Sequence, residues 1–112
     1  MTERLQTVVE THMYLSTAAF MSDSERAEII DVVAANPRAG TDLGAGLRKL
    51  RFGAAGRGKR AGARVVYLFG GEHMPIFLLA AFAKSARADL SQREFRTLKR
   101  IAQEIRALYR RS

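Results

Sequence analysis

The chain has 112 residues, of which 47% are hydrophobic, and this is enough for one domain with a single modest core. It lacks cysteine, a basic-then-apolar leader and any apolar run of membrane-spanning length, so we expect no disulfide, no thiolate metal site, no secretion signal and no membrane contact. We therefore expect a cytoplasmic protein, and its net charge of +8 favours a nucleic acid or an acidic protein as partner over a small neutral ligand.

The N-terminal part of the chain predicts a short strand followed by a short helix. Residues 5–10 form a β-branched run that is typical of a strand. Residues 13–20 are apolar and rich in good helix formers, and Thr11 has the right chemistry to cap them. Residues 1–46 together carry a net charge of −4, from 3 basic and 7 acidic side chains, so any anion-binding surface must come from later in the chain.

A second helix is predicted where a capping box begins. Ser22 and Glu25 have the S-x-x-E spacing in which each side chain accepts a hydrogen bond from the other residue's backbone N–H. This helix should end at about Asn36, because the residue before Pro37 avoids helical backbone. Residues 38–46, which include three glycines, are predicted to be a loop.

Three further strands are predicted in the middle of the chain. Residues 47–52 alternate in strand fashion and place Lys49 and Arg51 on one face, with apolar residues on the other. A glycine-rich loop follows, and residues 63–69 and 76–83 then form a hairpin. Because both strands of this hairpin are apolar on both faces, we expect them at the centre of the sheet, flanked by helices.

The C-terminal segment predicts one amphipathic helix. Ser91 and Glu94 form a second capping box. The helix has basic residues over much of its surface and one apolar stripe, made of Phe95, Leu98, Ile101, Ala102, Ile105, Leu108 and Tyr109. The predicted fold class is therefore α+β, with an antiparallel sheet of about four strands, N-terminal helices and a C-terminal helix packed on it in a single domain covering residues 1–112.

The positive charge is concentrated around the glycine-rich loop. Residues 47–64 contain no acidic side chain and seven basic ones, namely Arg48, Lys49, Arg51, Arg57, Lys59, Arg60 and Arg64. Gly56 and Gly58 allow the backbone to approach a phosphate closely, while Arg and Lys side chains neutralise its oxygens. This pattern predicts a nucleic-acid-binding site, and the alternative is a solvated loop whose charges contact no ligand.

Other kinds of chemistry are disfavoured by what the chain lacks. His12 and His73 are far apart in sequence, and neither has a carboxylate partner nearby. With no clustered carboxylate pair and no metal-ligand spacing, we expect neither a metal site nor a carboxylate-based hydrolase, and we expect no cofactor. A nucleotide-binding loop is also disfavoured, because the residues after the Gly-rich segment predict a strand where that motif requires a helix.

One reaction that fits the basic residues is cleavage of RNA by its own 2′-hydroxyl. This reaction needs proton transfer and stabilisation of the extra charge on the phosphate, and it needs no metal ion or carboxylate pair. A lysine crowded by cations has a lowered pKa and can act as a base. Lys49 or Lys59 is therefore a candidate for proton transfer. The candidate phosphate-stabilising residues are Arg51, Arg57 and Arg64, and Lys84 could reach the same face of the sheet.

The sequence resembles the RelE/HigB-type toxins of bacterial toxin–antitoxin systems, and most closely the HigB-like branch. The resemblance covers residues 36–105 and rests on Asn36-Pro37-x-Ala39-Gly40, Gly46-Leu47-Arg48-Lys49-Leu50-Arg51, Gly56-Arg57-Gly58-Lys59-Arg60-x-Gly62-x-Arg64-Val65-Val66-Tyr67, Phe82-Ala83-Lys84 and Ala88-Asp89-Leu90-Ser91. It implies a compact α+β toxin that enters the ribosomal A site, cleaves mRNA there and is held inactive by an antitoxin of acidic or helix-turn-helix character.

The same resemblance assigns expected roles to individual residues. Lys49, Arg51 and Arg64 match basic residues that serve RelE-type cleavage, and the loop with Arg57 and Lys59 joins that surface in the HigB-like branch. RelE-type enzymes often carry a tyrosine after the last strand as a proton-transfer group, and residues 84–92 contain none.

Two other functions fit the sequence. A ParE-like poison of DNA gyrase would share the fold and would produce DNA damage instead of mRNA fragments. A non-catalytic RNA-binding module would show steeply salt-dependent binding and leave RNA intact.

Overall fold

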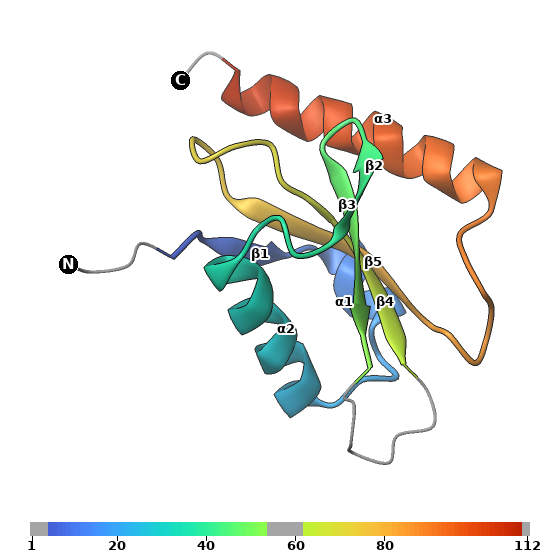
Figure 1. Cartoon of the computed structure of the whole chain (residues 1–112). Helices are drawn as coiled ribbons and strands as arrows, with labels where there is room; N and C mark the ends of the chain where they lie inside the picture. The colour runs from blue at the N-terminus through green and yellow to red at the C-terminus, as the bar shows by residue number, and fades with distance from the viewer. Residues whose placement is uncertain (1–4, 54–61, 111–112) are drawn as a thin grey trace.

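The computed structural model describes residues 5–53 and 62–110, which form one sheet with helices on both faces (Figure 1). The five strands have the spatial order β1-β5-β4-β3-β2. Their bounds are Val8–Glu10 (β1), Thr41–Gly44 (β2), Leu47–Phe52 (β3), Ala63–Leu68 (β4) and Ile76–Ala83 (β5). The helices are His12–Thr17 (α1), Asp23–Ala35 (α2) and Gln92–Tyr109 (α3). None of these helices is long and apolar enough to cross a membrane.

The sheet separates two hydrophobic cores. In β4, Val65 and Tyr67 pack with α1 and α2, whereas Val66 and Leu68 pack with α3 on the opposite face. This strand is central and all six of its residues are buried. The prediction that residues 63–69 and 76–83 lie inside the sheet with helices on both sides is thus confirmed, and so is the α+β fold class.

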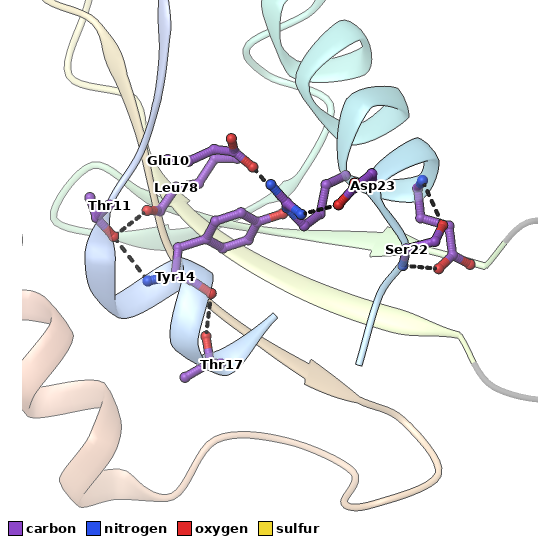
Figure 2. Close-up of polar contacts among 9 residues, drawn as sticks. Glu10, Thr11, Tyr14, Thr17, Ser22, Asp23 and Leu78 are labelled. Atoms are coloured by element: carbon purple, nitrogen blue, oxygen red, sulfur yellow. Dashed lines mark hydrogen bonds and ion pairs between the residues drawn. The ribbon is translucent and has the colours of Figure 1, made fainter. Parts of the chain in front are cut away.

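The predicted helix starts are also confirmed. Both capping boxes are complete, with Ser22 and Ser91 each accepting a hydrogen bond from the backbone of the glutamate three residues later. Thr11 caps α1 by accepting from the backbone N–H of Tyr14, and its hydroxyl donates to the carbonyl of Leu78 in β5 (Figure 2). Each such cap stabilises its helix by about 1 kcal/mol.

The sheet differs from the prediction in two ways. Residues 38–46 are not all loop, because Thr41–Gly44 forms the edge strand β2. This segment lacks a β-branched run, and its pairing with β3 could not be inferred from its own residues. In addition, β1 is shorter than predicted and pairs in parallel with β5, so the sheet is mixed and has five strands instead of about four.

One residue of the predicted apolar stripe faces solvent. Leu108 is 79% exposed, whereas Leu98 and Ala102 of the same helix are buried. At 3.6 residues per turn, Leu108 lies about 80° around the helix from Leu98, at the margin of the surface that packs on the sheet. The prediction was therefore wrong for Leu108.

Candidate phosphate-binding site

Three basic residues predicted for the site lie on one face of neighbouring strands. Lys49 and Arg51 are two residues apart in β3, so their side chains leave the same face of the sheet. Arg51 is paired directly with Arg64 of β4. Directly opposed residues in an antiparallel pair have Cβ atoms about 5 Å apart on the same face. The structure thus brings Lys49, Arg51 and Arg64 together.

This basic cluster lies on the α3 side of the sheet, at the end that the helix leaves uncovered. The apolar residues Leu47, Val66 and Leu68 occupy the other end of the β3–β4 pair and pack with α3. In Figure 1 the ends of β3 and β4 that carry the two arginines extend beyond the helix. The helix thus covers one half of this face, and the basic cluster lies on the other half, facing Asp89.

Arg64 is buried to an extent that is unusual for a charged side chain. It is 9% exposed, and it is the one buried charged residue within the two described ranges. Its guanidinium makes a 3.5 Å hydrogen bond from Nη1 to the neighbouring carbonyl of Ala63. Charged groups are rarely buried unless an opposite charge compensates them. A guanidinium held in this way is suited to bind an anion that enters the site.

The anion that faces this cluster in the protein itself is Asp89. Lys49 Nζ lies 3.1 Å from each carboxylate oxygen of Asp89. The backbone N–H of Leu90, donating at 2.8 Å, and the Lys49 ammonium lower the pKa of Asp89, and the charge of Arg64 acts in the same direction. Asp89 is therefore an ionised carboxylate at neutral pH. It occupies a place where a phosphate oxygen could bind.

Of two further predicted residues, Arg48 lies away from the cluster and Lys84 lies at the same end of the sheet. Arg48 leaves the opposite face of β3, where its guanidinium donates to the carbonyls of Gly40 (2.9 Å) and Arg38 (3.4 Å). These contacts hold the segment before β2, so the structure gives Arg48 a supporting position away from the cluster. Lys84 directly follows β5, is exposed, and lies at the same end of the sheet as Arg64.

Five predicted residues lie outside the described part of the chain, namely Gly56, Arg57, Gly58, Lys59 and Arg60. The strands on either side are described, and Phe52 is paired with Ala63. The predicted loop therefore joins β3 and β4 directly after this last strand pair, which is the neighbour of the Arg51–Arg64 pair.

Comparison with known proteins identifies the family. A family model described as "RelE toxin of RelE / RelB toxin-antitoxin system" matches residues 15–112. The chain belongs to the RelE toxin family. The solved structure of a free-state double mutant of the E. coli toxin RelE is similar, with a TM-score of 0.54 and 16% identity over 73% of this chain and 86% of that chain. That likeness shows a shared fold, while the predicted membership of the HigB-like branch stays a prediction.

Family membership makes this chain the toxin of a toxin–antitoxin pair, with an antitoxin as its partner. The basic cluster is the part of this RelE-family toxin with the clearest potential for phosphate chemistry. In the described ranges no group of His, Asp and Glu side chains is arranged to hold a metal ion.

Three described residues, Lys49, Tyr67 and His73, can be compared as candidates for proton transfer. Lys49 contacts a carboxylate, so it is not a lysine crowded only by cations, which was the condition for a role as base. Burial raises the pKa of Tyr67, and its hydroxyl donates to Pro37 and accepts from Gly40. His73 lies in the turn between β4 and β5, at the opposite end of the hairpin from Arg64.

Asp89 is the residue at this site that sequence reasoning missed. It appeared only as part of a family motif, although it is the one acidic residue between Glu72 and Glu94. A single carboxylate among basic residues was the sequence feature that could have indicated an ion pair at this site. Its pairing with Lys49, 40 positions away, could be seen only in the folded chain.

We expect Asp89→Asn to bind single-stranded RNA more tightly, because Lys49 would no longer be held by an internal carboxylate. A partly exposed ion pair contributes about 0.5–1 kcal/mol, so the dissociation constant for an RNA oligonucleotide should fall about twofold to fivefold, as measured by fluorescence anisotropy. Asp42→Asn is the matched control, because Asp42 pairs with Arg48 at 3.9 Å. Equal gains in the two variants would show that only net charge matters.

Proposed function

We propose that this toxin is an endoribonuclease that cleaves mRNA in the ribosomal A site and thereby stops translation in the cytoplasm. The observation that carries the proposal is the buried guanidinium of Arg64, which lies beside Arg51 on the face of the sheet that also presents Lys49. Family membership supports the same activity, since the chain belongs to the RelE toxins. A membership in the HigB-like branch, with its basic loop, is part of the proposal.

The chemistry that fits this cluster is transfer of the phosphate to the neighbouring ribose oxygen. The 2′-oxygen forms a bond to phosphorus while the bond from phosphorus to the 5′-oxygen breaks, giving a cyclic phosphate and a free 5′-hydroxyl. One proton leaves the 2′-hydroxyl and one reaches the 5′-oxygen. Arg64 and Arg51 would stabilise the added charge on the phosphate, and Lys49 would bind a non-bridging oxygen after leaving Asp89.

Dependence on the ribosome follows from the composition of the site. Cations stabilise the transition state, but the described residues near them offer no evident strong base. Holding the 2′-oxygen in line with the phosphate can supply several kcal/mol of the barrier. We propose that the ribosome provides this positioning, with Lys84 and the loop residues Arg57, Lys59 and Arg60 as further contacts to RNA. We further propose that the antitoxin is acidic or of the helix-turn-helix type.

The test compares one mRNA in two settings. In a translating extract the purified toxin should cut the message within codons, whereas the same mRNA without ribosomes should stay intact over the same period. Induction in cells should arrest growth, and mapped 5′-hydroxyl ends should lie in coding regions. Intact mRNA together with DNA breaks would contradict the proposal and favour a gyrase poison. RNA binding without any cleavage would favour a non-catalytic module.

A further inference from the structure

A small apolar hollow lies beside the phosphate-binding site. It has a volume of about 210 Å³ and lies between α1, the C-terminal half of β5 and the N-terminal half of α3. Ala80, Phe82 and Leu98 contribute apolar surface, while Arg87, Arg93 and Glu94 contribute charged groups, of which Arg87 and Glu94 form an ion pair. At about 30 Å³ per water molecule, the space equals roughly seven waters, which is enough for one planar ring system.

The hollow and the basic cluster share their boundary. Phe82 lines the hollow and is paired in the sheet with Arg64. Leu90 lines it as well, and it directly follows Asp89, the partner of Lys49. The hollow therefore lies within reach of the base of a nucleotide whose phosphate is bound by the cluster.

Arg87 gives the hollow a fixed planar surface. Its guanidinium carbon lies 5.0 Å from the centre of the Phe82 ring, and its Nη1 is 2.6 Å from a carboxylate oxygen of Glu94. The hydrogen bonds from Arg87 and from the backbone of Ser91 lower the pKa of Glu94 to about 2, so this pair is ionised at neutral pH. RNA-binding proteins commonly stack unpaired bases on arginine planes and aromatic rings.

We propose that this hollow binds one base of the RNA, next to the phosphate held by Lys49, Arg51 and Arg64, and so determines which nucleotide is preferred at the cut. The inference rests on the proposed function. An RNA base fits better than a peptide side chain because the hollow adjoins cations suited to phosphate and combines an apolar floor with a planar guanidinium. Base stacking of this kind contributes about 1–3 kcal/mol.

The test fills the hollow and reads out nucleotide preference. Thr97 lines it from α3 and is half-buried, so Thr97→Phe places a ring in the space that a base would occupy. Gln103→Phe is the matched control, since Gln103 is exposed further along the same helix. Wild type and both variants are induced in cells, and all cleavage ends are sequenced. We expect Thr97→Phe to change the base ratio at one position beside the cut by at least about fivefold, and Gln103→Phe to leave it unchanged.

A second variant distinguishes loss of base binding from loss of folding. Arg87→Ala removes the stacking plane without adding bulk, and it should shift the ratio at the same position. Thermal unfolding of each purified variant shows whether it is folded. If folded variants show unchanged base ratios, with cleavage normal or uniformly reduced, the inference is overturned. If the antitoxin then neutralises these variants less well than wild type, the hollow binds a protein instead of an RNA base. If the wild type cuts no RNA at all, the proposed function itself fails.

Discussion

Arg64→Ala should lower mRNA cleavage in a translating extract by about 10²–10³-fold and abolish growth arrest. Arg64 is the buried cation of the cluster, it is paired with Arg51 in the sheet, and its charge contributes to lowering the pKa of Asp89. Removing a fixed donor that meets charge developing in a transition state has an effect of this size. The measurement is the initial rate of cleavage at a single mapped site.

Two variants separate this effect from general loss of charge or of folding. Arg100→Ala removes the same charge from an exposed position on α3 and should cut at nearly the normal rate. Arg64→Lys keeps the charge but loses the planar fork, so its rate should fall between those of wild type and Arg64→Ala. A folded Arg64→Ala protein that cuts as fast as Arg100→Ala would remove Arg64 from the catalytic site.

Local sequence patterns predicted much of this fold because they report on nearby contacts. The alternation in residues 47–52 was sufficient to place Lys49 and Arg51 on one face, and two capping boxes marked the starts of α2 and α3. The parallel pairing of β1 with β5 could not be predicted from local sequence patterns, because it joins segments nearly 70 positions apart. Edge strand β2 is also set by its partner, since its own residues have no strong strand preference.

The same distinction applies to the candidate site. Arg51 and Arg64 belong to one basic segment, so the sequence predicted that both bind phosphate. Their direct pairing could not be predicted, because it depends on the register of β3 with β4. Arg48 belongs to that segment too and was predicted to bind phosphate, but it lies on the other face of β3, where it contacts the carbonyls of Gly40 and Arg38. The contacts of Asp89 with Lys49 and of Arg87 with Phe82 depend on how the segment between β5 and α3 folds back over the sheet.

Replacing Tyr67 with phenylalanine should destabilise the protein more than the same replacement at either of the other two described tyrosines. The Tyr67 side chain is fully buried, and its hydroxyl donates to Pro37 at 2.7 Å and accepts from the backbone N–H of Gly40 at 2.9 Å. Phenylalanine would leave both backbone groups without this partner. The expected loss is about 2–3 kcal/mol of the free energy of unfolding, measured by urea denaturation, with a melting temperature lower by roughly 10 °C.

Tyr14→Phe is the matched control, because it is the same chemical change in an equally buried side chain with a different hydrogen-bonding state. Within residues 5–53 and 62–110 the Tyr14 hydroxyl has no hydrogen-bond partner, and it lies near the Glu10–Arg26 ion pair (Figure 2). Burial, followed by the charge of Glu10, raises its pKa to about 12, so the phenol is neutral at physiological pH. Removing an unpaired buried hydroxyl should leave stability unchanged or raise it by about 1 kcal/mol. Equal destabilisation by the two substitutions would contradict the prediction, because it would show that the two hydrogen bonds of Tyr67 contribute no more than an unpaired buried hydroxyl does.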